Sequence, residues 1–392
     1  MKGVIRQIFD DHLPAVLAER AQHDLSEREW RGVWCMATCR TSAQGTHAIT
    51  CPDGHGTAKE AFNSCHHRGC VQCGWPATQR WIERREAQVL LCAHVHTIWT
   101  MPDALDPLWL YNRKAYTVML FRACWETVQT LMLDPRWCGG RPGMLAVFQS
   151  WGDYTQRHPH LHAIVTAGGV DEDGNWHEPK HSFVICARVA MPLFRGKMRA
   201  FILEGLADGS LVCPPETNVA HWTHEANRQG LRRWNVNVQP PYAETGRVIR
   251  YLGAYLKHGP ISEKRVESYD GHTVRIAHRH PEEHENASYE LTGEEFVRRL
   301  LLHMPEPRVH TSRAYGLYHP AAQKMLAKAR AQLPQMPEPS APDETRTPAR
   351  RVSVTPPPVC PECGRPLRVH VLIHGGQSPP QSFRALQRRR AA

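Results

Sequence analysis

The chain has 392 residues, enough for one large domain with smaller attached modules. Its 48 Lys and Arg outnumber its 38 Asp and Glu, so the formal net charge is +10. A polyanionic partner such as nucleic acid fits this balance, and a basic protein without such a partner is the alternative. The sequence lacks an uncharged apolar run of about 18 residues and an N-terminal secretory signal. We therefore expect no membrane partner and a cytoplasmic location, where thiols stay reduced.

Residues 1–85 are predicted to form a zinc-binding, DNA-recognition module. Reduced thiols at close spacing indicate metal ligands rather than disulfides, and structural zinc takes four S or N ligands. The candidate Zn²⁺ ligands are Cys39, His47, Cys51, His55, Cys65, Cys70 and Cys73. Cys51 and His55 with Cys70 and Cys73 would make one site, and the rest, with His66 or His67, would make a second. Ordinary buried thiols are the alternative.

The basic residues around and after the last of these cysteines are candidate DNA contacts. Lys and Arg that neutralise phosphates supply most of the sequence-independent affinity for DNA. The candidates are Arg68, Arg80, Arg84 and Arg85.

Residues 86–330 mix short apolar strands with helices, which indicates an α+β domain that carries the chemistry. Strands are predicted at 95–100, 145–149 and 160–166. Helical spacing predicts helices over 107–132, 192–206, 247–258 and 293–303, and Gly259-Pro260 gives the third of these a stop signal.

His160 and His162 are two apart on a predicted strand, so both imidazoles point to one face while Leu161 turns into the core. Such a pair can hold one divalent cation and leave coordination positions open for phosphate oxygens and water. The chain has 25 His, including the close pair His94 and His96, so hydrogen-bonded structural histidines are the alternative.

Tyr251 and Tyr255 are four apart on a predicted helix and therefore share a face. Core packing is the alternative for such an aromatic pair. A phenol with a pKa of about 10 is a weak nucleophile at neutral pH, so it needs help from a cation that polarises the phosphate. Attack would join the protein to a 5′-phosphate and conserve the bond energy, so that resealing needs no ATP. Nearby candidate phosphate contacts are Arg247, Lys257 and His258.

Several segments resemble, in the same order, the two-tyrosine HUH transposases of the IS91 family, which move by rolling-circle transfer of one strand. The resemblance covers roughly residues 35 to 330. Its segments are Asn63-Ser64-Cys65, Trp151-Gly152 with residues 158–165, residues 251–262, residues 294–301 and Tyr315-Gly316-Leu317-Tyr318.

The resemblance implies an HUH endonuclease fold, with a central antiparallel sheet flanked by helices and the tyrosine helix facing a metal on the sheet. It implies that His160 and His162 bind Mg²⁺ or Mn²⁺ and that Tyr251 and Tyr255 are nucleophiles. A third metal ligand is usual in such folds. His96 is the first candidate for it and Gln149 is the alternative.

The expected function is that of a transposase that nicks and rejoins single-stranded DNA of transposon ends and target, associated with the bacterial nucleoid when it acts. One alternative keeps the chemistry and makes the protein a plasmid replication initiator or relaxase. Another makes it a non-catalytic, zinc-dependent DNA-binding regulator. The chain departs from the family where Gly54-His55 replaces the usual second Cys and Gly after Cys51, so His55 is expected to replace that Cys.

Residues 331–392 are predicted to be a Pro-rich linker and a basic tail that ends in Arg388-Arg389-Arg390. Within the tail, Cys360-Pro361-Glu362-Cys363-Gly364 has the form of a metal-binding knuckle. No partner pair of ligands is obvious in the sequence. A weak metal site and an idle tail both remain open.

Overall fold

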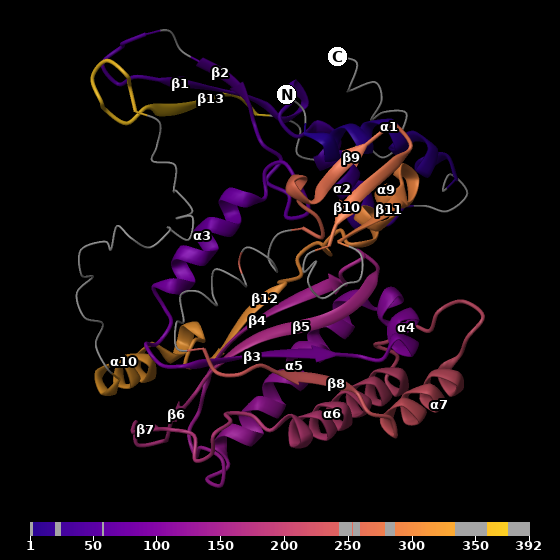
Figure 1. Ribbon diagram of the computed structural model, residues 1–392, viewed down its shortest axis with the longest axis vertical. Coiled ribbons are helices and arrows are strands. Elements are labelled where there is room, and N and C mark those ends of the chain that lie inside the picture. The colour runs from indigo at the N-terminus through magenta and orange to yellow at the C-terminus, as the bar shows by residue number, and fades with distance from the viewer. Residues whose placement is uncertain are drawn as a thin grey trace.

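The computed structural model describes residues 3–19, 25–56, 59–242, 253, 259–278, 287–333 and 359–374. Its centre is a five-stranded antiparallel sheet in the order β12-β4-β5-β3-β8 (Figure 1). The strands are β3 (His94–Thr100), β4 (Gly143–Trp151), β5 (Arg157–Thr166), β8 (Asn235–Val238) and β12 (Ser312–Gly316). The three predicted strands are thereby confirmed, and the fold is α+β as expected.

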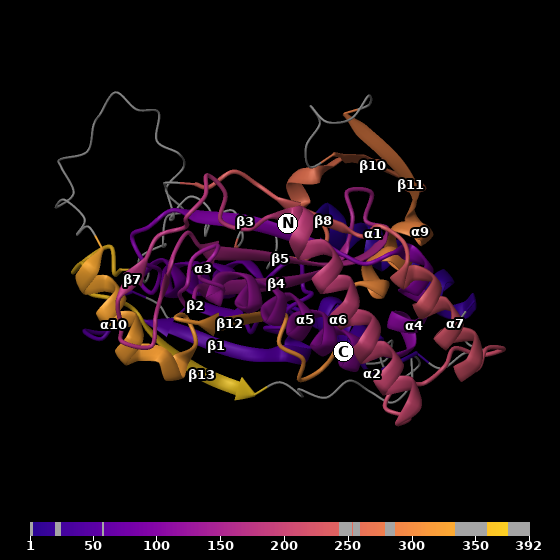
Figure 2. The ribbon, with the colours of Figure 1, turned by 90° about the horizontal axis from the view of Figure 1, so that it is seen from below.

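One face of the sheet is covered by α4 (Asp106–Tyr111), α5 (Arg113–Leu133), α6 (Ala187–Ala207) and α7 (Val219–Gly230), which Figure 2 shows from below. Side chains of alternate strand residues, such as Leu161 and Trp99, enter this core. Trp99 meets Phe194 of α6 edge-on, with ring centroids 5.2 Å apart. This core fixes which strand residues point to the opposite face.

The predicted helix over 107–132 is in fact two helices that meet at Asn112. The Asn112 side-chain amide donates to the Leu108 carbonyl at 2.9 Å and to the Val212 carbonyl at 2.7 Å. Its side-chain oxygen accepts from the Val212 N–H at 2.7 Å. A contact across 100 positions therefore breaks the helix.

The opposite face of the sheet packs against α3 (Trp75–Glu86) and α10 (Gln323–Gln332). Ile82 of α3 lies in one apolar cluster with Val147 of β4 and Ile164 of β5. Gly253 is buried beside α3, and a Cβ added to it would overlap the Ile82 side chain. Residue 253 is therefore held close to the helix that covers this face.

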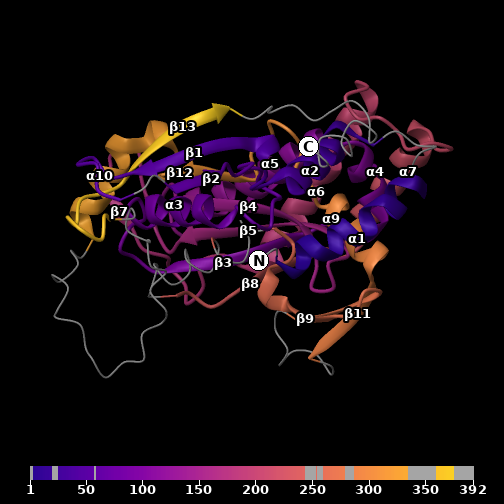
Figure 3. The ribbon, with the colours of Figure 1, turned by 90° about the horizontal axis from the view of Figure 1, so that it is seen from above.

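A second core joins the start of the chain to residues 261–304. It contains α1 (Val4–Glu19), α2 (Glu27–Thr38), α9 (Gly293–Leu302) and the sheet β11-β10-β9, formed by Ser288–Thr292, Thr273–Ala277 and Val266–Tyr269. Figure 3 shows α1 beside α9. This core crosses the predicted domain boundary at residue 85.

A third sheet has the order β13-β1-β2, from Arg368–His374, Gly45–Thr50 and Lys59–Phe62. The C-terminal strand thus returns to the N-terminal region. Smaller elements are β6 (Gly169–Val170), β7 (Trp176–His177) and the 3₁₀ turns η1 (Ser42–Gln44), η2 (Asp103–Leu105), η4 (Glu263–Arg265) and η6 (Pro320–Ala322).

The predicted helices at 192–206 and 293–303 correspond to α6 and α9. Apart from Gly253, the predicted helix over 247–258 lies outside the described residues, and so do Tyr251, Tyr255, Arg247, Lys257 and His258. In the described part of the chain, no helix combines the length and apolar character needed to cross a bilayer.

Candidate functional site

The two predicted histidine ligands and Gln149 come together on the α3 face of the central sheet. His160 and His162 are on β5, and Gln149 of β4 is the direct cross-strand partner of His160. All three side chains are buried. They share their face with Val147 and Ile164, because residues two apart on a strand point the same way.

Three donor atoms of this group converge. His160 Nε2 lies 2.9 Å from His162 Nε2, which in turn lies 3.0 Å from Gln149 Oε1. Adjacent ligands of an octahedral ion such as Mg²⁺, at bonds of about 2.1 Å, are roughly 3 Å apart. The spacing and the mixed N and O chemistry of these atoms fit a divalent cation.

The outer nitrogens of both rings also have partners. His160 Nδ1 donates to the His158 carbonyl at 2.6 Å, which leaves the lone pair on Nε2. His162 Nδ1 faces His96 Nε2 at 3.0 Å, and the two rings are stacked. Burial lowers the pKa of His96 to about 4, so this ring is neutral at pH 7. His96 therefore lies behind His162, on the side away from the converging atoms.

His94, the neighbour of His96 on β3, is a core residue. Its Nδ1 donates to the Cys92 carbonyl at 2.8 Å, and its Nε2 lies 2.6 Å from the hydroxyl of Tyr318. Tyr318 is buried and its hydroxyl also accepts from the Leu90 N–H at 3.2 Å. His94 is therefore a hydrogen-bonded structural histidine, which is the alternative that the sequence left open for close histidine pairs.

Four of the predicted zinc ligands form a thiol cluster that fits structural zinc. The ligand atoms of Cys39, Cys65, Cys70 and Cys73 lie within 4.8 Å of one another, and the Cys65 and Cys73 sulfurs are 3.6 Å apart. Tetrahedral zinc with Zn–S bonds of about 2.3 Å separates its sulfurs by roughly 3.8 Å. Cys39 follows α2, and the other three precede α3, so this site links the two helices.

The other zinc candidates are arranged differently from the prediction. Cys51 and His55 group with Cys360 and Cys363, not with Cys70 and Cys73. The reason is topological, because Cys51 follows β1, which pairs with the C-terminal strand β13.

His47 lies outside both groups. It is on β1, and its Nδ1 is 2.7 Å from Asn63 Oδ1. The structure therefore does not place His47 with the other predicted zinc ligands.

Two cavities lie beside the thiol cluster and contain arginines. One, of about 370 Å³, is lined by Arg68 and Arg80, and the other, of about 770 Å³, is lined by Arg68, Arg31 and Arg308. Burial, together with the charges of Arg31 and Arg68, lowers the pKa of His67, on the wall of both, to about 4. Arg31 was missed because it precedes the Cys motifs rather than following them, and Arg308 because it is far from them in sequence.

The remaining predicted basic residues lie along α3. Arg84 is exposed. Arg85 is half-buried, stacks on Trp81 and donates to Gln88 Oε1 at 2.6 Å. Arg85 is therefore already engaged within the protein, whereas Arg84 faces solvent.

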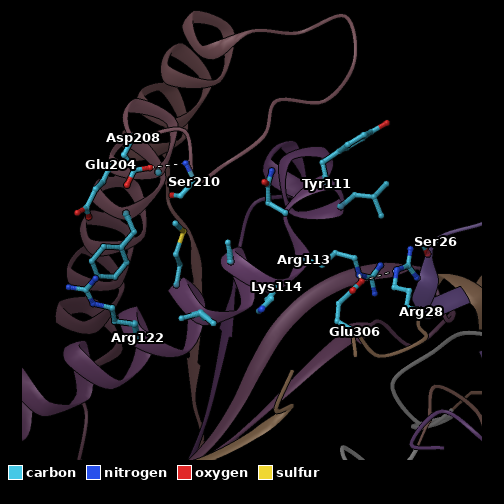
Figure 4. A pocket seen from close by; sticks show the side chains of 17 residues that line it. Ser26, Arg28, Tyr111, Arg113, Lys114, Arg122, Glu204, Asp208, Ser210 and Glu306 are labelled. Atoms are coloured by element: carbon cyan, nitrogen blue, oxygen red, sulfur yellow. Dashed lines mark hydrogen bonds and ion pairs between the residues drawn. The ribbon is translucent and has the colours of Figure 1, made fainter. Parts of the chain in front are cut away.

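A further cavity of about 750 Å³ lies near α5 and α6 (Figure 4). Glu306 on its wall forms ion pairs with two arginines, Arg28 at 2.8 Å and Arg113 at 3.2 Å. None of the histidines of the sheet site lines it. We therefore do not assign the chemistry to this cavity.

Comparisons with known proteins are consistent with these sites. Residues 143–325 match a family model described as "Putative transposase", and residues 8–101 match one described as "Transposase zinc-binding domain". The chain is 32% identical over 377 residues to "Putative transposase y4qJ" of Sinorhizobium fredii, covering 93% of this chain and 94% of that protein.

A second relative is the transposase for insertion sequence element IS801 of Pseudomonas savastanoi pv. phaseolicola. It is 30% identical over 304 residues, which cover 74% of this chain and 70% of that protein. No solved structure matches the chain. The match to the first family model includes β4 and β5, and the match to the second includes the thiol cluster before α3.

Proposed function

The chain belongs to the IS91 transposase family, and on that premise we propose that it nicks and rejoins single-stranded DNA at insertion-sequence ends through a 5′-phosphotyrosine intermediate. Its substrates are single strands of the transposon ends and of the target. It acts in the bacterial cytoplasm, at the nucleoid.

The observation that carries the proposal is the face of the sheet shared by the histidines and by α3. His160, His162 and Gln149 point to the side on which Ile82 packs. Gly253 contacts Ile82, and in the sequence it lies midway between Tyr251 and Tyr255. This supports an arrangement in which the tyrosine pair is on the same side of the sheet as the imidazoles.

His160, His162 and Gln149 are the residues that would hold the divalent cation, Mg²⁺ or Mn²⁺. Gln149 takes the role of third ligand, because its Oε1 is near His162 Nε2. His96 orients His162, because His96 Nε2 pairs with His162 Nδ1. When bound, the cation polarises the scissile phosphate and stabilises the departing 3′-oxygen. All four side chains are buried.

The proposed reaction transfers the strand to tyrosine and back. A tyrosine oxygen attacks the scissile phosphorus, its proton is lost, and the bond from phosphorus to the 3′-oxygen breaks. The departing 3′-oxygen takes a proton, and the 5′-phosphate stays on the tyrosine. A 3′-hydroxyl reverses the step and reseals the strand. With two tyrosines, one can hold the first cut end while the other accepts the next cut end.

The DNA is held by the zinc-bearing region and the arginines around it. Arg68 borders both cavities next to the thiol cluster, and Arg31, Arg80 and Arg308 each border one of them. Arg84 extends this positive surface along α3. Affinity built on such phosphate contacts falls steeply as the salt concentration rises.

The test is a covalent adduct with single-stranded DNA from an element end. Incubation with Mg²⁺ or Mn²⁺ is expected to give a protein-DNA species that survives denaturation. The double variant Tyr251→Phe/Tyr255→Phe should form none, because both nucleophilic oxygens are missing. Tyr242→Phe is the matched control, since Tyr242 is 40% exposed and lies outside the pair, and it should keep the adduct. An adduct of normal yield in the double variant would refute the tyrosine mechanism.

A further inference from the structure

A second cluster of metal-ligating side chains combines two distant parts of the chain. The ligand atoms of Cys51, His55, Cys360 and Cys363 lie within 4.8 Å of one another. Cys51 Sγ is 3.5 Å from Cys363 Sγ and 3.7 Å from His55 Nδ1, and Cys360 Sγ is 4.0 Å from His55 Nδ1. Residues 51 and 363 are 312 positions apart.

We propose that these four residues form a second structural zinc site, which ties the C-terminal segment to the N-terminal recognition region. Three thiolates and one imidazole are a standard ligand set for structural zinc. Ligand atoms around a tetrahedral ion are roughly 3.5 to 3.8 Å apart for bonds of about 2.1 to 2.3 Å. The two separations measured from Cys51 Sγ fall in this range, and the 4.0 Å between Cys360 Sγ and His55 Nδ1 is slightly longer. The sulfur separation of 3.5 Å is far longer than the bond of about 2.05 Å in a disulfide.

Both turns that supply the ligands have the backbone shape of a metal knuckle. In the C-terminal turn, the Gly364 N–H donates to the Cys360 carbonyl at 2.8 Å, and Gly364 has φ +70°. In the N-terminal turn, the Asp53 N–H points to Cys51 Sγ at 3.4 Å. An N–H that points at a sulfur favours the thiolate, which is the form that binds metal.

Strand pairing brings the two turns together. β13 pairs antiparallel with β1, and Thr50, the residue before Cys51, is opposite Arg368. An ion pair joins Arg365 to Asp53 at 3.0 Å. The site is therefore at the end of the β1–β13 ladder. The C-terminal segment completes the zinc-binding region that the matched family model covers only at residues 8–101.

This assignment is independent of the strand-transfer proposal, because it concerns folding and not cleavage. Metal binding that requires both segments adds its free energy to their pairing. The β1–β13 ladder should therefore loosen when this zinc is absent, while the central sheet keeps its structure.

Zinc stoichiometry of the full chain tests the proposal. We expect two Zn²⁺ per wild-type chain purified with zinc sulfate, one in the Cys51, His55, Cys360, Cys363 site and one in the thiol cluster before α3. Cys360→Ser/Cys363→Ser should bind one. Cys186→Ser/Cys213→Ser is the matched control, since these half-buried thiols lie outside both groups, and it should keep two. A wild-type chain with one zinc, or two zincs in Cys360→Ser/Cys363→Ser, would overturn the proposal.

A measurement on the wild type covers the case in which that variant does not fold. X-ray absorption at the zinc edge should report the average of the two ligand sets, which is seven sulfurs and one nitrogen for two ions. An all-sulfur environment would overturn the proposal. In a folded variant, hydrogen exchange should accelerate in Gly45–Thr50 and Arg368–His374 and stay unchanged in β4 and β5. Unchanged exchange in β1 and β13 would show that no metal ties the segment.

Discussion

Gln149 and His96 both contact His162, but at different ring nitrogens. This difference makes Gln149 the proposed metal ligand and His96 the residue that orients His162. Gln149 Oε1 is near Nε2, where His160 Nε2 also lies, whereas His96 is near Nδ1. We expect Gln149→Glu to bind Mn²⁺ at least as tightly as the wild type, because a carboxylate oxygen replaces the amide oxygen. His96→Ala should weaken binding by about 10–100-fold, the usual effect of removing an outer partner, and Gln149→Ala should weaken it more.

The measurement is the Mn²⁺ dissociation constant, from electron paramagnetic resonance of the metal-free protein. Gln239→Ala is a control, since Gln239 follows β8 and bonds only Asn237 among the contacts described for its side chain. Loss of binding in His96→Ala with none in Gln149→Ala would make His96 the third ligand instead.

His303 gives the fold a dependence on pH. Its Nε2 donates to the Thr155 carbonyl at 2.8 Å and its Nδ1 accepts from the Ser150 hydroxyl at 3.0 Å, so the neutral ring is satisfied. Burial lowers the pKa of His303 to about 3. In the unfolded chain the ring gains its proton at a pH of about 6.5. Stability is therefore lost as pH falls from about 6.5 towards 3, by up to about 1.4 kcal/mol for each unit.

Urea unfolding at pH 7 and pH 5 checks this expectation. His303→Gln should be less stable than the wild type at pH 7, because packing is altered, yet it should lose less free energy of unfolding between the two pH values. His94, whose burial lowers its pKa to about 4, still titrates in the variant, so part of the slope remains. An identical slope in both proteins would remove His303 as a cause.

At the scale of elements, what is local was predictable from the sequence. The alternation of residues 160–166 placed His160 and His162 on one face, because the period of a strand depends on that strand alone. The choice between His96 and Gln149 depends on the register of β3 and β4 against β5, which long-range pairing sets. The sequence did not predict the break at Asn112 or the partner of the Cys360 knuckle for the same reason, because each depends on a contact across 100 positions or more.

The contact between α3 and Gly253 leads to a prediction about packing. A Cβ at residue 253 would overlap the Ile82 side chain, so Gly253→Ala should destabilise the fold by about 1–3 kcal/mol, the usual effect of overpacking. It should also slow adduct formation, because residue 253 lies between the two tyrosines in the sequence. Ile82→Ala removes the obstructing atoms, so the double variant should be more stable than the sum of the single changes predicts.

Thermal unfolding of the two single variants and the double variant measures this coupling. Gly196→Ala is the matched control, because Gly196 lies on α6 with open space around it and should tolerate the methyl group. Additive effects of Gly253→Ala and Ile82→Ala would mean that the two residues do not press on each other.

At the scale of the whole molecule, sequence neighbours do not always share a core. α1 and α2 pack with α9 and the β9–β11 sheet, and β13 pairs with β1, so the start of the chain meets both its middle and its end. The predicted three-part division could not anticipate this, because composition reveals linkers and motifs but not which distant segments bury each other. The family resemblance gave the order of the motifs along the chain, and the structure shows which distant segments pack against one another.

The central claim is that a tyrosine of the 251–255 pair carries the cut strand, and the position of the covalent link tests it most directly. Trypsin cleaves after Arg250 and Lys257, which releases Tyr251-Leu252-Gly253-Ala254-Tyr255-Leu256-Lys257 as one peptide. After nuclease trimming of the adduct, mass spectrometry should find a nucleotide joined through its 5′-phosphate to Tyr251 or Tyr255 of this peptide. A nucleotide on any other peptide, or on a residue other than tyrosine, would contradict the account.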